Sequence, residues 1–149
     1  MTVSTNAAAE FICERSGWAI TQLSLQKILY IAHMVHMGRG HGPLVPGHFE
    51  AWDYGPVHPV LYQKVKGFGA KPIPNVFWTK TAPDGVDLAT LTEACEQLLP
   101  LSPGALVQNT HWRLGAWAKH YNASGRGIVI PEADIIAEYQ ARVGHSAAA

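Results

Sequence analysis

Apolar residues recur at helical spacing between Thr21 and Met37, and this segment gives the strongest structural prediction in the chain. Leu25, Ile28, Leu29 and Ala32 follow the i, i+3, i+4, i+7 rule, and further apolar residues occupy an adjacent face. A helix that is apolar on most sides is typical of a protein core. We therefore expect residues 21–37 to form a central hydrophobic helix around which the domain packs.

The rest of the pattern predicts more helices and little strand. Helical spacing or helix-start residues occur in segments 7–16, 59–66, 87–99, 102–107, 131–144 and, in part, 111–121. We expect Asn6 to cap the first helix, and residues 48–53 to be able to pair with 128–130 as a ribbon. The prediction is a mainly α fold, a single compact domain over residues 1–149 with six or seven helices and at most one small β-ribbon. Its core spans about 8–142 and its tail, 145–149, is frayed.

A long loop is predicted over residues 70–86, which contain three prolines and a glycine near the end. Loops of this length inside a compact domain are often functional. Trp and Tyr are common energetic centres of protein interfaces. We therefore predict that the partner-binding residues are Phe68, Phe77, Trp78 and Lys80. Trp52 and Trp112 are expected in the core.

The charge balance argues against general nucleic-acid binding. Eleven Lys and Arg residues offset eleven Asp and Glu residues, so the formal net charge is zero. Phosphate neutralisation dominates nucleic-acid affinity, so only a local basic face would support DNA binding; Lys64, Lys66, Lys71 and Lys80 are the candidates. Charged residues are only 15% of the chain. Either polar uncharged side chains cover the surface, or a stable partner covers part of it.

The sequence also predicts a cytoplasmic protein. Cys13 and Cys95 lie far apart, form no CxxC motif and occupy apolar helical positions, so we expect buried, reduced thiols. Residues 1–17 do not resemble a signal peptide. No apolar run approaches the roughly 18 residues that a membrane span needs.

Candidate catalytic chemistry is sparse. His33 and His36 share a helix face, with His41 and His48 close behind, but a metal site would need a further ligand from elsewhere. No GxSxG, GxGxxG or GxxxxGK[ST] motif occurs. Glu50 and Asp53 are expected to accept backbone N–H bonds rather than act as acid and base. We predict no catalytic residues, metal or cofactor. The alternative is an enzyme of unknown reaction with a polar or metal site around His33, His36 and Glu50.

Three blocks resemble one known family. Leu25–His33 (LQKILYIAH) resembles the LQKLLYxAxx signature of the Panacea domain, which is the domain of the SocA-like antitoxins. Phe49–Tyr62 (FEAWDYGPVHPVLY) resembles its EAWxYGPVxPxLY motif. The segment that begins with Ile130 and Pro131 resembles its closing IPxxxIxxYF pattern, with Gln140 in place of the usual terminal aromatic.

The blocks also suggest structural roles for their residues. Lys27 is the sole cation in its apolar helix, and we predict a contact with Glu50 or Asp53; the alternative is a side chain that extends to solvent. Tyr54, Gly55 and Pro56 are expected to form a turn that holds Trp52 on the core. The motif residues are Leu25, Lys27, Leu29, Tyr30, Glu50, Trp52, Tyr54, Gly55, Pro56, Tyr62 and Pro131.

What the resemblance implies is a non-enzymatic antitoxin that binds and neutralises a cognate toxin protein. It further implies a proteolytic adaptor that delivers the toxin to the ClpXP protease, which makes ClpX a second partner. The tail Ala147–Ala149 resembles the C-terminal alanine signals that ClpX reads. A plain small-residue end is the alternative.

Overall fold

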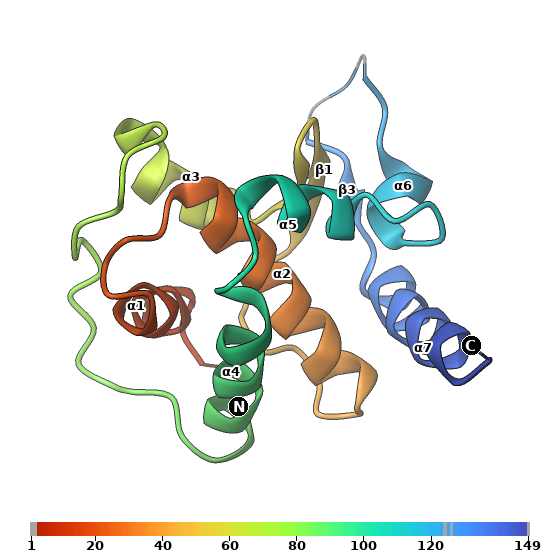
Figure 1. The fold of residues 1–149 in the computed structure, drawn as a ribbon, viewed down its shortest axis with the longest axis horizontal. Coiled ribbons are helices and arrows are strands. Elements are labelled where there is room, and N and C mark those ends of the chain that lie inside the picture. The colour runs from red at the N-terminus through yellow and green to blue at the C-terminus, as the bar shows by residue number, and fades with distance from the viewer. Residues whose placement is uncertain (1–2, 124, 126, 149) are drawn as a thin grey trace.

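Helix α2 (Gln22–Gly38) forms the centre of the molecule. The computed structural model describes residues 3–123, 125 and 127–148, the last four by their backbone alone. In Figure 1, α2 crosses the domain diagonally, and other helices surround it. Every residue from Ser24 to Met34 is buried. The predicted central hydrophobic helix is therefore confirmed, within one residue at each end.

Six further α-helices accompany α2 in the described residues, so the predicted mainly α fold is confirmed. Four of them pack against α2: α1 (Thr5–Arg15), α4 (Gly85–Leu98), α5 (Pro103–Thr110) and α7 (Glu132–Ala148). The shorter ones are α3 (Pro59–Val65) and α6 (Ala116–His120), and a single 3-10 turn, η1 (Lys66–Phe68), follows α3.

Two helix ends differ from the predictions. The cap of α1 is Ser4, whose side chain accepts a hydrogen bond from the Ala7 N–H, and not Asn6, which lies inside the helix. Helix α7 passes through Gly144 and continues to Ala148, because Gly144 keeps a negative φ and a helix tolerates glycine at a cost of about 1 kcal/mol. The helix thus extends past its predicted end at Gly144, and the frayed tail stays a prediction. The proposed alanine signal lies outside the described side chains.

A small sheet covers one side of α2. Strand β1 (Phe49–Trp52) pairs antiparallel with β3 (Val129–Ile130), in the register Phe49↔Ile130, which confirms the predicted ribbon. The sheet has a third strand, β2 (Gly55–Val57), which pairs antiparallel with the other edge of β1. The sequence indicated only a turn there. Gly55 supplies the φ of 114° that lets the chain reverse and pair at once.

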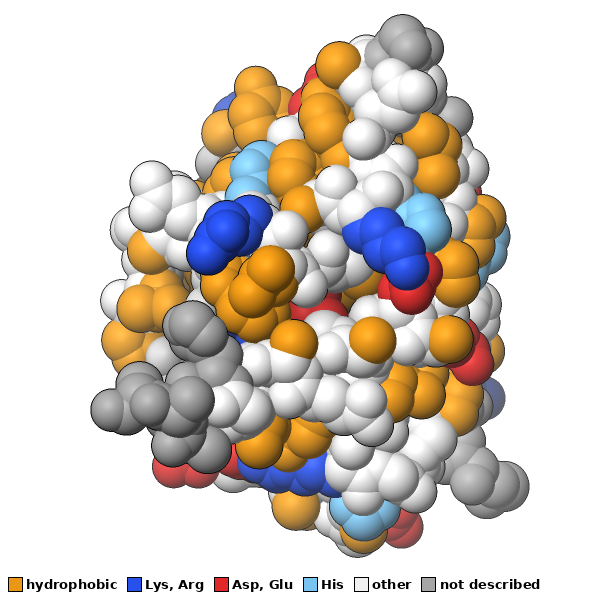
Figure 2. All heavy atoms as spheres, turned by 90° about the vertical axis from the view of Figure 1, so that its right-hand side faces the viewer, with side chains coloured by type: hydrophobic (Ala, Val, Ile, Leu, Met, Phe, Trp, Pro, Cys, Tyr) orange, Lys and Arg blue, Asp and Glu red, His pale blue; other side chains and the backbone are white. Residues whose placement is uncertain are grey.

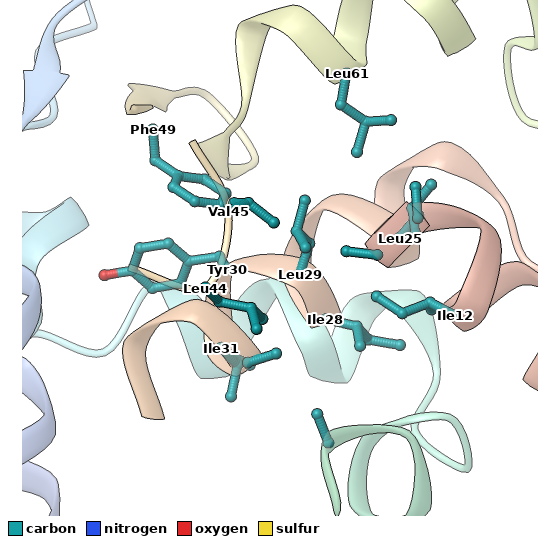
Figure 3. Packing of buried hydrophobic residues seen from close by; sticks show 14 of the residues in the cluster. Ile12, Leu25, Ile28, Leu29, Tyr30, Ile31, Leu44, Val45, Phe49 and Leu61 are labelled. Carbon is teal, nitrogen blue, oxygen red and sulfur yellow. The ribbon is translucent and has the colours of Figure 1, made fainter. Parts of the chain in front are cut away.

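The core is built on apolar side chains of α2. Figure 3 shows Leu25, Ile28 and Leu29 pointing into the same cluster, with the Tyr30 ring beside Phe49 of β1. The two rings meet edge to face at 5.3 Å. Each such Leu or Ile contributes roughly 1.5–3 kcal/mol when it is fully buried.

Helices α2 and α7 approach closely at Gly38. A Cβ at this position would overlap the Tyr139 ring of α7, so only glycine fits against that ring. The contact joins the first and third sequence blocks, because Tyr139 belongs to the segment that follows Pro131.

The molecular surface carries few charges. On the face in Figure 2, Lys, Arg, Asp and Glu side chains are scattered among hydrophobic and uncharged polar ones. In the part of the chain that the structure describes, no helix has the length and apolar character needed to cross a membrane.

Candidate functional site

The first two sequence blocks meet through Gln26. Its side-chain oxygen accepts from the His58 N–H at 2.8 Å, and its Nε2 donates to the His58 carbonyl at 3.2 Å. His58 in turn caps α3 by accepting from the Leu61 N–H, and its Nε2 lies 2.8 Å from the Pro46 carbonyl oxygen. Gln26 thus fixes the start of α3 against the buried centre of α2.

Lys27 makes the second link between the blocks, with a partner that differs from the predicted one. Its Nζ donates to the carbonyl oxygen of Pro56 at 3.0 Å, and the side chain is 1% exposed. The predicted ion pair with Glu50 or Asp53 is wrong, and so is the alternative of a solvated lysine. The Lys27 side chain passes close to Gly55, where a Cβ would lie 2.9 Å from Lys27 Cε. Glycine is needed at this turn both for its positive φ and for the space that Lys27 fills.

Burial changes the acidity of this lysine. Desolvation lowers the pKa of Lys27 from 10.5 to about 7, because no anion beside it compensates for the loss of water. Buried cations are costly unless they are paired. The family motif therefore places an uncompensated amine in the middle of the domain.

A cleft of about 860 Å³ opens over Lys27. It is the size of a typical small-ligand site. Three aromatic residues of the second block line it, namely Trp52, Tyr54 and Tyr62. The other described lining residues are Thr21, Gln22, Leu23, Gln26, Asp53, Val57, Gly69, Ala70, Pro103, Ala123 and Gly125. Motif residues that are far apart in sequence thus converge on one concavity.

The two carboxylates of the second block make hydrogen bonds with side chains, whereas we expected bonds to backbone N–H groups. Glu50 accepts from Trp52 Nε1 at 2.9 Å and lies 2.9 Å from His48 Nε2. Asp53 accepts from the Tyr121 hydroxyl at 2.7 Å. The Trp52 ring stands edge to face against Tyr62 at 4.7 Å. Trp52 and Trp112 are half-buried rather than core residues; the most buried tryptophan is Trp117.

A buried polar network attaches α7 to α2. The Tyr30 hydroxyl donates to Glu138 Oε1 at 2.6 Å, and the Ala116 N–H donates to the same oxygen at 3.0 Å. Arg142 donates to Glu138 Oε2 at 2.8 Å and also holds Asn109 of α5. The sequence gave no sign of this role for Glu138, which lies on a helix with many exposed neighbours.

Among the described side chains, the histidines do not assemble a metal site. His33 Nδ1 accepts from the Leu44 and Val45 N–H groups, and desolvation lowers the pKa of this ring to about 4. His36 lies between the Gly42 carbonyl and Asp87. Within the described residues there is no group of three or more His, Cys, Asp or Glu placed to hold a metal ion. His33, His36 and Glu50 each have separate partners, so the geometry does not favour the alternative site around them.

Both cysteines are buried. Desolvation raises the pKa of Cys13 to about 12 and that of Cys95 to about 11. A thiol held in its neutral form is a poor nucleophile. These residues act as small core side chains, as we predicted.

The structure separates the four predicted partner-binding residues: Phe77, Trp78 and Lys80 lie in the loop that precedes α4, and Phe68 ends η1. Phe77 is 3% exposed and packs in the core, so its side chain is not available at the surface. Trp78 is 81% exposed, Lys80 is exposed, and Phe68 is half-buried against the core. Neighbouring residues of one extended segment point to opposite sides, and a local pattern does not reveal which side faces the core.

A family model matches the sequence over more than half of the chain. The model of the family described as "Antitoxin SocA-like, Panacea domain" matches residues 25–118, which include both blocks that line the cleft. The chain belongs to this family. Its membership supports an antitoxin role.

One curated relative lies within this family. The chain is 33% identical over 144 aligned positions to a protein named Antitoxin SocA from Caulobacter vibrioides (strain NA1000 / CB15N). The alignment covers 85% of this chain and 75% of that protein. No solved structure shows significant similarity to the chain.

Two residues of the site escaped the sequence analysis. Gln26 was a polar residue at a buried position of the most apolar helix, and that contrast was a usable signal. His111, at the end of α5, stacks on Trp117 with ring centroids 3.7 Å apart, and its buried Nε2 has no hydrogen-bond partner. Burial, followed by the charge of Lys27, lowers the pKa of His111.

Proposed function

We propose that this protein is an antitoxin that binds a cognate toxin directly and neutralises it without catalysis. Family membership and 33% identity to Antitoxin SocA are the observations that carry the proposal. His33, His36 and Glu50, the residues of the alternative enzymatic site, are engaged in structural contacts, which agrees with a binding role. The low charge of the surface is also suited to a protein that spends much of its time in a complex.

Trp78 is the residue that we place at the centre of the toxin interface, with Phe68 and Lys80 beside it. The preceding residue, Phe77, is anchored in the core. The following residue, Thr79, donates from Oγ1 to Glu10 of α1 at 2.7 Å. These two anchors hold the backbone at Trp78, whose indole is 81% exposed, and its φ of 51° is a costly conformation for a bulky residue. A preorganised aromatic residue binds a partner with a smaller loss of entropy.

The test is co-expression with the product of the adjacent open reading frame. Wild-type protein is expected to co-purify with that product and to relieve its toxicity. Trp78→Ser is expected to weaken co-purification about tenfold or more, as for an interface centre. Leu114→Ser is the matched control, because Leu114 is also exposed, at 50%, but lies outside the loop. Equal retention by both variants would move the interface away from Trp78; absence of any complex would contradict the antitoxin proposal.

We further propose that the neutralised toxin is delivered to the ClpXP protease. The family resemblance supports this step. The half-life of the neighbouring product is expected to shorten only when this protein and ClpXP are both present. A toxin that is bound but remains stable would show that binding alone masks it. A variant without residues 147–149 tests the tail: unchanged turnover would remove the alanine signal from the mechanism.

A further inference from the structure

Lys27, at the cleft, has more hydrogen-bond donors than its contacts within the described part of the domain use. An ammonium group has three N–H donors. The one acceptor that the structure gives Lys27 is the Pro56 carbonyl, although the residue is 1% exposed and lines the cleft. The side chain is nearly inaccessible to bulk water, so an acceptor that enters through the cleft would satisfy its other donors.

Several other polar groups of the wall already have partners within the domain. Both ends of the Gln26 amide bind His58, and Gln22 Nε2 donates to the Gly69 carbonyl at 2.9 Å. Asp53, at the exposed end of the β1–β2 turn, accepts from Tyr121. Among the described lining residues, Lys27 is therefore the charged group that has donors to offer a ligand.

The charges on the wall define what kind of acceptor fits. Lys27 is the single cation among the described lining residues, and Asp53 adds a negative charge at the rim. A phosphate, with up to two charges and three oxygens, is usually held by several donors or cations. One buried ammonium matches one carboxylate, which would supply the missing counter-charge. Trp52, Tyr54 and Tyr62 offer apolar ring surface to the group that bears this carboxylate.

We propose that the cleft is a binding site for a monocarboxylate attached to an apolar or aromatic body, with Lys27 holding the carboxylate. The carboxylate belongs either to a free small molecule or to an acidic side chain or chain end of a bound protein. The second source rests on the antitoxin proposal, whereas the site itself does not.

The test uses 3-phenylpropionate as the probe and its neutral analogue, 3-phenylpropionamide, as the matched control. Two-dimensional ¹H–¹⁵N spectra of the full chain are expected to show saturable shifts at Lys27, Val57 and the Trp52 indole with the acid. The amide is expected to bind about tenfold more weakly, because it lacks the charge that strengthens a hydrogen bond. Equal shifts with both compounds, or none with the acid up to its solubility limit, would overturn the proposal.

Two variants locate the binding. Lys27→Met is expected to abolish the preference for the acid over the amide. If that variant does not fold, Tyr54→Ala provides the second measure, since Tyr54 lines the cleft but is 67% exposed. This variant is expected to bind 3-phenylpropionate severalfold more weakly than wild type. Trp78→Ser, in the loop, should bind the probe like wild type. A probe affinity that is unchanged in Tyr54→Ala would place binding elsewhere and contradict the proposal.

A final arm identifies the source of the carboxylate. The probe is added to the complex with the product of the adjacent open reading frame. Displacement of that protein, or its failure to bind Lys27→Met, assigns the carboxylate to the partner. Probe binding without displacement assigns the cleft to a free carboxylate. If no complex forms, the antitoxin proposal fails, but the probe titration on the free chain still decides the fate of the site.

Discussion

The Tyr30 hydroxyl donates to Glu138 Oε1 at 2.6 Å across 108 positions of sequence, and this bond joins the central helix to the last one. Both groups are buried, and this burial, followed by the charge and the hydrogen bond of Glu138, raises the pKa of the Tyr30 phenol well above 10. Glu138 also binds Arg142 and the Ala116 N–H, so one carboxylate fixes α2, α6 and α7 together.

Tyr30→Phe is expected to lower the free energy of unfolding by about 1.5–3 kcal/mol, the usual contribution of a hydrogen bond to a charged group. The ring and its contact with Phe49 remain, so the change in the free energy of unfolding measures the contribution of the hydroxyl alone. Urea denaturation followed by circular dichroism measures the change. Tyr121→Phe is the control: it removes a hydroxyl bond to exposed Asp53 and should cost less than about 0.5 kcal/mol. Equal costs would show that burial of the Glu138 bond contributes nothing.

Gly38→Ala is expected to destabilise the protein by about 1–3 kcal/mol, because the added methyl group would overlap the Tyr139 ring and force α7 away from α2. Gly104→Ala is the opposite case. Gly104 lies in α5 with open space around it and a negative φ, so alanine should stabilise the fold by about 0.5–1 kcal/mol. Thermal unfolding of both variants measures whether each substitution lowers or raises the stability, as expected for Gly38→Ala and Gly104→Ala respectively. A Gly38→Ala protein as stable as wild type would mean that α7 does not pack as described.

The helices could be predicted from the sequence better than the contacts that join the first two sequence blocks. The hydrophobic period of residues 21–37 identified the central helix because burial imposes that period on every turn. The sequence also singled out Lys27 as unusual. It did not reveal the Pro56 carbonyl as the partner. Every residue has a backbone carbonyl, so the sequence does not indicate which of them accepts a hydrogen bond from Lys27. The same limit hid the third strand, which depends on a backbone pairing, and the Gln26–His58 pair.

Stability is expected to depend on pH through Lys27. Its folded pKa of about 7 lies below the ordinary 10.5, so between these values the unfolded chain binds a proton that the folded protein does not. The contribution of Lys27 to stability is therefore lost as pH falls from about 10 to 7, by about 1.4 kcal/mol per pH unit. The measurement is the stability of wild type minus that of Lys27→Met at pH 7, 8 and 9. This difference should rise with pH, and a flat difference would show that Lys27 stays charged in the fold.

His33 is expected to stay neutral at pH 5.5, where an ordinary histidine is charged. Its pKa is lowered to about 4, first by burial and then by His58 and His36, and its Nδ1 must keep a lone pair to accept from Leu44 and Val45. Because the unfolded chain takes up this proton near pH 6.5, stability should fall as pH drops from there toward 4. The ¹H–¹⁵N signals of the imidazole report its protonation directly. A cationic His33 ring in folded protein at pH 5.5 would contradict the buried acceptor role.

Neighbouring aromatic residues of the loop should separate stability from binding. Phe77→Ala is expected to cost about 3–5 kcal/mol, since the side chain is 3% exposed and its removal leaves a cavity. Trp78→Ala should change stability by less than about 0.5 kcal/mol, or increase it slightly by relieving a bulky residue held at a φ of 51°.

The two variants are compared by urea denaturation of the free protein and by co-purification with the product of the adjacent open reading frame. The Trp78→Ala variant is expected to stay folded but no longer co-purify with that product, because the indole is exposed while its backbone is anchored on both sides. Phe77→Ala, tested at a temperature where it is still folded, should retain part of its binding, since it alters the support and not the contacting surface. A Trp78→Ala protein that keeps full binding would move the interface off this loop. Loss of stability in Trp78→Ala comparable to that in Phe77→Ala would mean that the indole packs against the domain rather than standing free in solvent.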